Sequence, residues 1–198
     1  MTMDNHGLQK QKSELRAKIR AALEKFPPER RAADSTKACA LLRQKPVWQS
    51  AQSVLLFASQ ADELHVWPLL DAGIAAGKIA ALPAFDIGSQ NYTARRVRRP
   101  HGNEIVSGHF GIREPSKSCV EIPLDHFDLI LVPGIAFDLR GHRLGRGKGF
   151  YDRLLAEVRG VKCGIAFDGQ IVEKIPAEAH DVRMDFILTP TRCLEIAG

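Results

Sequence analysis

The fold is decided by the stretch Leu129-Ile-Leu-Val-Pro-Gly-Ile-Ala-Phe-Asp-Leu-Arg-Gly-His-Arg-Leu-Gly-Arg-Gly-Lys-Gly-Phe-Tyr-Asp152. Its first four residues are apolar and predict a strand buried on both faces, which Pro133-Gly134 ends. A loop follows in which glycines at 141, 145, 147 and 149 are interleaved with cations, and residues 151–158 predict a helix. A buried strand, a loop and a helix in this order are typical of an α/β protein.

The loop has the composition of an anion-binding site. Glycines let backbone N–H groups approach a ligand, and cations beside a helix N-terminus supply the charge that an anion needs. The polyphosphate of a nucleotide is the expected ligand, and a plain solvated turn is the alternative. The loop is not a Walker A motif, because Gly149 stands where Ser or Thr would bind Mg²⁺. It is not a good dinucleotide fingerprint either, because Phe150 replaces the third glycine.

Length and composition fit a single domain over residues 1–198, with 44% hydrophobic and 26% charged residues. No apolar run approaches the ~20 residues of a membrane span, and residues 1–7 lack a signal-peptide core. The four cysteines are scattered, which argues against zinc and fits a reducing compartment. We therefore expect a soluble, cytoplasmic protein with no membrane partner. We also expect a monomer, although the sequence itself does not give the oligomeric state.

The net charge of +5 suits small anionic substrates and also allows nucleic-acid binding. Arg95 to Arg99 is the densest basic run, and a solvated strand or loop is its ordinary interpretation. Only 7% of residues are aromatic, so stacking platforms for bases are scarce. We expect small-molecule substrates and no nucleic-acid partner.

Hydrophobic spacing predicts alternating helices and strands in the rest of the chain. Leu15, Ile19 and Leu23 lie on one face of a first helix, and residues 29–44 predict a second one. Residues 100–126 show little pattern and predict a long surface excursion. The alternation predicts a Rossmann-like, three-layer α/β fold, with a single open, mostly parallel sheet flanked by helices on both faces. Further strands are expected at 53–58, 78–83, 92–99, 161–167, 170–172 and, last, 186–189, and a helix at 66–76.

Charged side chains outside the loop have both ordinary and functional interpretations. Lys12 and Arg16 are four residues apart, hence on one face of the first helix, where solvated charge is the ordinary explanation. Glu63 follows the strand at 53–58, and ligands in open α/β sheets bind at such strand ends. A carboxylate at a helix start is the alternative for Glu63.

Residues 141–153, Gly-His-Arg-Leu-Gly-Arg-Gly-Lys-Gly-Phe-Tyr-Asp-Arg, resemble the signature of the 5-formyltetrahydrofolate cyclo-ligase family, also called methenyltetrahydrofolate synthetase. The likeness extends over nearly the whole chain and is weakest from 88 to 108. The chain departs from the family at His65-Val66, where Asp-Thr is usual. Further matching motifs are Asp62-Glu63, Phe110-Gly-Ile-x-Glu-Pro115, and Gly164-Ile-Ala-Phe-Asp-x-Gln170 followed by His180-Asp-Val-x-x-Asp185.

The resemblance implies ATP- and Mg²⁺-dependent cyclisation of 5-formyltetrahydrofolate to 5,10-methenyltetrahydrofolate, with release of ADP and phosphate, through a phosphorylated formyl group. Implied catalytic residues are Arg146, Lys148 and Tyr151. Implied ATP-binding residues are Lys12 (or Lys10), Arg16, Arg143, Leu144, Gly145, Arg146, Gly147, Lys148, Gly149, Phe150 and Tyr151. Implied substrate-binding residues are Ala58, Glu63, Arg146, Gly147, Lys148, Gly149 and Phe150. Asp152 and Asp181 are the implied magnesium ligands.

Asp152 also has a physical reason to hold a metal. It lies four residues after Lys148, beside the expected triphosphate, and a bridging Mg²⁺ removes the repulsion between the negative groups. Stabilisation of the first helical turn is the alternative. Nothing near His180-Asp181 requires a metal. Phe150 and Tyr151 suit either core packing or stacking on the pterin ring, and Phe150 lacks the hydroxyl that relatives often have there.

Two other classes of function are compatible with these patterns. An NAD(P)-linked oxidoreductase would use Asp168, 23 residues beyond Gly145, as its ribose ligand. A basic nucleic-acid-binding module would be centred on Arg95 to Arg99 and would be released by salt.

Overall fold

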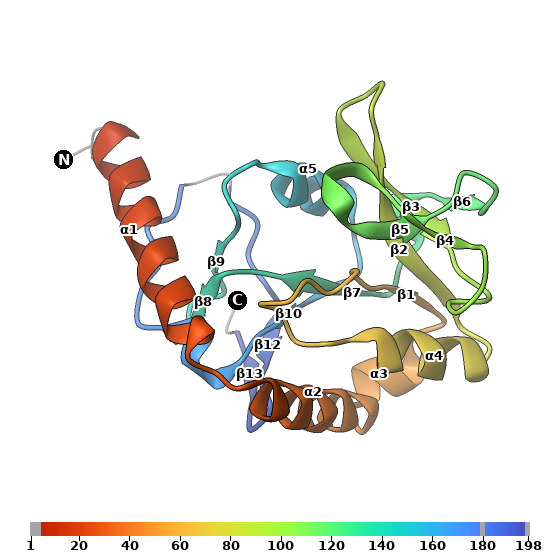
Figure 1. Ribbon diagram of the computed structural model, residues 1–198, viewed down its shortest axis with the longest axis horizontal. Coiled ribbons are helices and arrows are strands. Elements are labelled where there is room, and N and C mark those ends of the chain that lie inside the picture. Colours follow the sequence, from red (N-terminus) through yellow and green to blue (C-terminus); the bar gives the residue numbers. More distant parts are fainter. Residues whose placement is uncertain (1–4, 179–180, 197–198) are drawn as a thin grey trace.

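Five parallel strands form the middle of the molecule (Figure 1) in the computed structural model, which describes residues 5–178 and 181–196. They belong to an eight-stranded sheet of order β13-β12-β10-β7-β1-β2-β3-β6, in which β12 to β2 are parallel neighbours. The other three strands are antiparallel and lie at the two edges. The strands are β1 (Ser53–Leu55), β2 (Ile79–Asp86), β3 (Asn91–Arg96), β6 (Glu121–Ile122), β7 (Leu129–Pro133), β10 (Val161–Ile165), β12 (Phe186–Leu188) and β13 (Cys193–Glu195).

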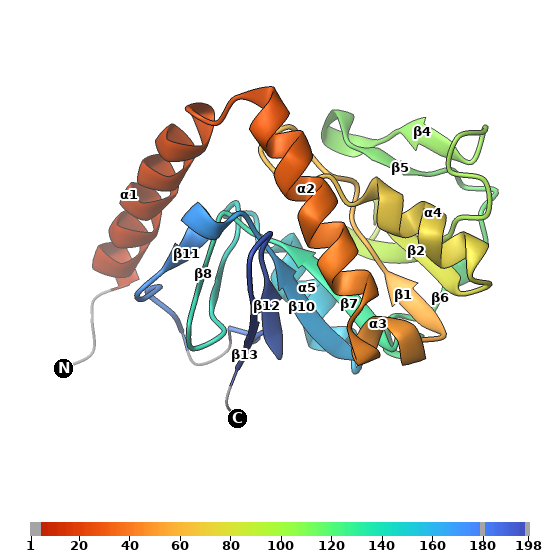
Figure 2. The same ribbon diagram turned by 90° about the horizontal axis from the view of Figure 1, so that it is seen from below.

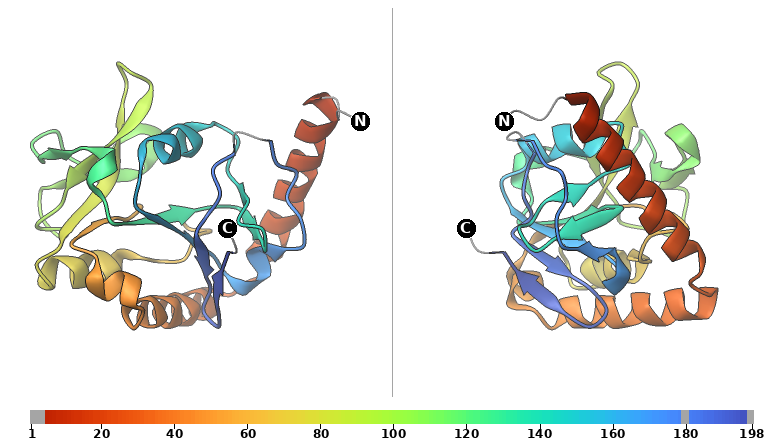
Figure 3. Two further views of the ribbon diagram at one scale, coloured as in Figure 1. Left: turned by 180° about the vertical axis from the view of Figure 1, so that it is seen from behind. Right: turned by 90° about the vertical axis from the view of Figure 1, so that its left-hand side faces the viewer.

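Helices cover both faces of this sheet, which confirms the predicted, mostly parallel α/β fold. Figures 1 and 2 show α2, α3 and α4 on one face and α5 on the other. Helix α1 stands at one end of the molecule, and Figure 3 shows it rising past the end of α2. The helices are α1 (Asn5–Glu24), α2 (Pro28–Arg43), α3 (Pro46–Ser50), α4 (Trp67–Ala75) and α5 (Phe150–Glu157).

Strand β7 is the centre of the core, and all of its residues are buried. Leu129 and Leu131 belong to the apolar cluster that includes residues of α2, α3 and α4. Ile130 and Val132 alternate with them and belong to the cluster that includes residues of α5. Each such side chain contributes about 1.5–3 kcal/mol of burial free energy, so β7 fixes the position of the loop that follows it.

The loop after β7 is more regular than the sequence predicts. Its first part forms the antiparallel strands β8 (Ala136–Asp138) and β9 (Arg143–Leu144), and β11 (Ile171–Val172) joins β8 to make a second, small sheet. Asp138 is fully buried, and its carboxylate accepts hydrogen bonds from the backbone N–H groups of Arg140, His142 and Ile175. This carboxylate therefore fixes the turn between β8 and β9.

A second cause of order in this region is Phe137. A Cβ atom placed on either Gly134 or Gly164 would lie 2.7 Å from the Phe137 ring. The missing side chains thus let the ring pack directly between β7 and β10. The small sheet is held against the large one by this contact.

Other expectations need correction. The region 100–126 is not irregular, because it contains β4 (Ile105–Ser107), β5 (Arg113–Pro115), β6 and short 3₁₀ turns at 109–111 and 124–126. The strand at 186–189 is not the last one, because β13 follows and pairs antiparallel with β12. Strand β1 ends at Leu55, earlier than expected. The single-domain organisation of residues 1–198 stays a prediction.

Within the described residues, none of the helices combines the length and the hydropathy that crossing a membrane requires.

Candidate active site

A cavity of about 210 Å³ opens where β1 and β7 end. Its wall combines the segments after these two strands with the glycine-rich loop, the first turn of α5 and the region around β5. Ligand sites in open α/β sheets lie at such strand ends. The lining residues are Phe57, Ala58, Gln60, Glu63, Pro83, Tyr92, His109, Ile112, Arg113, Glu114, Pro133, Gly134, Arg143, Gly145, Arg146, Gly147, Lys148, Gly149, Phe150, Tyr151 and Asp152.

The glycines of the loop have backbone conformations that other residues rarely adopt. Gly147 has φ of 97°, and Gly149, which is the N-cap of α5, has φ of 68°. A Cβ atom on Gly147 would also lie 3.4 Å from the guanidinium carbon of Arg16. The loop can thus curve tightly between α1 and the cavity.

Glu63 is a buried carboxylate on the cavity wall, with its side chain 7% exposed. Burial raises its pKa, and the Gln60 N–H group at 2.9 Å and the Arg146 guanidinium oppose that shift. Arg146 Nη2 lies 2.9 Å from Glu63 Oε1 and 2.5 Å from Asp62 Oδ1. The basic loop is thereby joined to the segment after β1, across more than 80 residues of sequence.

Asp152 lies in the first turn of α5 and forms an ion pair with Arg143. The Arg143 side chain is 5% exposed, whereas that of Asp152 is 49% exposed. Arg143 also lies over the Tyr151 ring, 5.7 Å from its centroid. The carboxylate therefore stands at the opening of the cavity, where a ligand can reach it.

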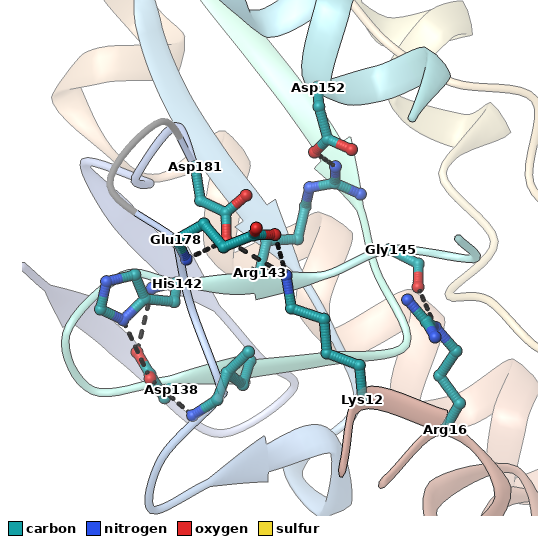
Figure 4. Close-up of polar contacts among 10 residues, drawn as sticks. Lys12, Arg16, Asp138, His142, Arg143, Gly145, Asp152, Glu178 and Asp181 are labelled. Carbon is teal, nitrogen blue, oxygen red and sulfur yellow. Dashed lines mark hydrogen bonds and ion pairs between the residues drawn. The ribbon is translucent and has the colours of Figure 1, made fainter. Parts of the chain in front are cut away.

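Helix α1 approaches the loop from the side (Figure 4). Arg16 Nε donates a hydrogen bond to the carbonyl oxygen of Gly145 at 2.8 Å. Lys12 is 9% exposed, and its Nζ atom lies 3.2 Å from Glu178 Oε2 and 3.5 Å from Asp181 Oδ2. Lys10 is exposed, so Lys12 is the lysine that this helix turns inward, toward Glu178 and Asp181.

An aromatic cluster closes the other side of the cavity. The ring centroids of Phe150 and Phe85 are 5.0 Å apart, and those of Phe150 and Tyr92 are 5.8 Å apart. Phe85 also stacks on His109, with centroids 4.6 Å apart. Burial, followed by the charge of Glu63, raises the pKa of Tyr151 well above its ordinary value, so its hydroxyl stays protonated at neutral pH.

Most of the predicted site residues meet in this cavity. Lys12, Arg16 and Asp181 lie outside its wall; Arg16 contacts the loop at Gly145, whereas Lys12 and Asp181 pair with each other. Leu144 is buried in the core. Sequence reasoning missed the contributions of Asp62, Tyr92, His109, Arg113 and Glu114. His180 and residues 1–4 lie outside the described residues.

Asp152 and Asp181 carry carboxylates, which are the type of protein ligand that Mg²⁺ prefers. Mg²⁺ is commonly held by one or two carboxylates together with substrate phosphates, and Asp152 is an accessible carboxylate at the loop. Asp181 instead accepts from Lys12 and from the Glu178 N–H group. In residues 5–178 and 181–196, no group of three or more His, Cys, Asp or Glu side chains is placed to hold a metal by itself. Both metal assignments stay predictions.

The residues of the alternative functions are engaged elsewhere. Asp168 accepts hydrogen bonds from the hydroxyls of Thr189 and Thr191, both at 2.6 Å, and does not line the cavity. In the basic run, Val97 is buried, Arg95 pairs with Glu121 and Arg99 pairs with Glu104.

Solved structures and curated proteins resemble the chain over nearly its full length. The NMR structure of 5,10-methenyltetrahydrofolate synthetase from Aquifex aeolicus matches with a TM-score of 0.84 and 33% identity, covering 94% of this chain and 93% of that one. The 5-formyltetrahydrofolate cyclo-ligase of Escherichia coli K12 is 32% identical over 89% of this chain and 99% of that protein. The cyclo-ligase of Mus musculus is 31% identical over 88% and 91%.

An α/β sheet with a glycine-rich basic loop beside its cavity, together with these similarities, defines an enzyme of the ATP-dependent ligase class. More particularly, the model of the 5-formyltetrahydrofolate cyclo-ligase family matches residues 8–190, and the chain belongs to that family. This membership confirms the resemblance and decides against the oxidoreductase and nucleic-acid alternatives.

Proposed function

We propose that this enzyme catalyses the ATP- and Mg²⁺-dependent cyclisation of 5-formyltetrahydrofolate to 5,10-methenyltetrahydrofolate, with release of ADP and phosphate. The observation that carries the proposal is that the loop from Gly145 to Gly149 and the buried carboxylate Glu63 line one cavity. A phosphoryl donor on the loop and a folate ring beside Glu63 would then be neighbours, as the transfer requires.

The formyl oxygen is a poor leaving group, and phosphorylation solves this difficulty. The oxygen attacks the γ-phosphorus, the bond to the β,γ-bridging oxygen breaks, and ADP leaves, giving an N5-iminium phosphate. N10 then attacks the formyl carbon, the C–O bond breaks with loss of phosphate, and the N10 proton is released. The protein's contribution is alignment and charge neutralisation.

The cations around the loop hold the phosphates in this mechanism. Arg143, Arg146 and Lys148 line the cavity, Arg16 of α1 contacts the same loop, and Lys12 lies one turn before Arg16 on that helix. Fixed cations and N–H groups stabilise charge that develops during transfer. When bound, Mg²⁺ would be held by Asp152, with Asp181 as a second candidate, and would neutralise phosphate charge.

The folate ring occupies the part of the cavity between Glu63 and the aromatic cluster. A buried carboxylate accepts hydrogen bonds from the N–H groups of a pterin, and its burial strengthens them. Phe150 offers a ring for stacking. The protonated hydroxyl of Tyr151 is a donor near the reacting oxygen, and Ala58 leaves room at the end of β1.

The test is direct. The purified chain with 5-formyltetrahydrofolate and Mg-ATP should produce the near-UV absorption of the methenyl product, with one ADP and one phosphate per turnover. Omission of ATP should abolish the signal. Absence of product with all components present would overturn the proposal. We also expect the same preparation to be monomeric.

A further inference from the structure

Arg113 is an exposed cation on the wall of the cavity, at the start of β5. Its guanidinium carbon lies 3.6 Å from the centroid of the Trp67 ring. Trp67 is 5% exposed in the first turn of α4, so it forms a fixed platform. Stacking on an indole uses the face of the guanidinium and leaves the N–H groups along its edge available to a ligand.

The side chain of Arg113 makes no hydrogen bond or ion pair with another residue in the part of the chain that the structure describes. The other arginines on the wall are engaged, Arg143 with Asp152 and Arg146 with Glu63. Asp71, the carboxylate of α4, instead lies 3.1 Å from His101 Nε2. An oriented guanidinium without a carboxylate partner is prepared to bind an anionic group from outside the protein.

The size of the cavity indicates which group this is. Pockets that enclose drug-sized ligands measure about 300–1,000 Å³, so a cavity of about 210 Å³ encloses only part of a folate. The flat ring suits the inner part beside buried Glu63. The two carboxylates of the glutamate tail stay ionised, and burial without a cation would cost several kcal/mol. They therefore belong at the exposed rim.

We propose that Arg113, oriented by Trp67, binds the glutamate carboxylates of the folate substrate and so determines specificity for the charged tail. This inference rests on the proposed function, and it adds a residue that sequence reasoning did not assign. Trp67 is a positioning residue, since it acts through Arg113.

The experiment compares 5-formyltetrahydrofolate with an analogue whose two glutamate carboxylates are amides. We expect Arg113→Gln to raise KM for the natural substrate about five- to tenfold, the effect of one charge-assisted hydrogen bond at a partly exposed site. KM for the diamide, KM for ATP and kcat should stay within twofold of the wild type. The wild-type preference for the charged substrate should disappear, and in the wild type it should weaken at high salt.

Arg98→Gln is the matched control, because Arg98 is exposed, carries the same charge and does not line the cavity. It should keep the wild-type preference. Trp67→Phe keeps a ring under the guanidinium and should lose only part of the preference.

An equal rise of KM for both substrates in Arg113→Gln, or no rise for either, would overturn the inference. Failure of the proposed function is recognised separately, because the wild type would then convert neither substrate. In that case, the affinities of the two compounds for the wild type and for Arg113→Gln, measured by calorimetry, still decide whether Arg113 binds the glutamate carboxylates.

Discussion

Lys148 stands between two glycines on the exposed part of the loop and on the cavity wall. We expect Lys148→Ala to lower kcat/KM for ATP about 100- to 1,000-fold, because removing one group that stabilises developing negative charge has that effect. The melting temperature should change little, since exposed substitutions stay within about 0.5 kcal/mol. Lys174→Ala, on an exposed lysine away from the cavity, should have wild-type kinetics. Near-normal turnover of Lys148→Ala would remove this lysine from the site.

Asp152 is the second residue whose role can be separated from folding. Asp152→Asn keeps the size of the side chain but removes the charge that would hold Mg²⁺ and that pairs with Arg143. We expect a higher magnesium requirement in activity titrations, with folate affinity nearly unchanged. Identical magnesium titrations for variant and wild type would contradict the metal role.

The raised pKa of Glu63 predicts that folate affinity depends on pH. Burial raises its pKa, so the carboxylate becomes protonated above the usual range near 4.3 as the pH falls. Folate affinity should therefore weaken from neutral pH toward acid in the wild type, and the Glu63→Gln variant should bind weakly with no such limb.

The pH dependence of stability has the opposite sign from that of folate affinity. Because folding raises the pKa of Glu63, the folded state favours its protonated form. The stability of the wild type relative to Glu63→Gln should therefore decline as the pH rises through that raised pKa. Thermal melts over the same pH range check the sign. A constant difference would show that Glu63 does not titrate there.

Within the described residues, one side-chain hydrogen bond joins helix α1 to Gly145, and Arg16 donates it. We expect Arg16→Ala to raise KM for ATP and to increase hydrogen exchange in α1, because the helix loses its attachment to the loop. Arg20 is one turn further along α1 and exposed, so Arg20→Ala is the matched control. Equal exchange in both variants would mean that Arg16 does not hold the helix.

The elements that sequence predicts well are those set by local patterns. Strand β7 follows from four consecutive apolar residues and a Pro-Gly stop, and α5 follows from the change of pattern after the last loop glycine. The β8–β9 pair could not be predicted, because the buried Asp138 that organises its turn looks like any loop carboxylate. Likewise, the Arg146–Glu63 pair and the stack of Arg113 on Trp67 join distant segments, and single-sequence periodicity carries no information on them.

The reactivity of the four cysteines can report whether the molecule unfolds as one unit. All are unpaired thiols, and Cys39 and Cys163 are buried. Burial raises the pKa of Cys39 to about 11 and that of Cys163 well above its ordinary value, so neither forms much thiolate at pH 8. Pulsed alkylation followed by mass spectrometry should label these two only at the urea concentration of global unfolding, and Cys119 earlier. Labelling of Cys39 before the circular dichroism transition would indicate local opening instead.

Lys12 pairs with residues far along the chain, because its partners Glu178 and Asp181 are 166 and 169 residues away. A ribosome adds about 5–20 residues per second, so roughly ten to thirty seconds of translation separate the emergence of the lysine from that of its carboxylates. This corner of the proposed nucleotide site can therefore assemble only after Glu178 and Asp181 have been synthesised. A nascent polypeptide that is released before residue 178 leaves the ribosome without it.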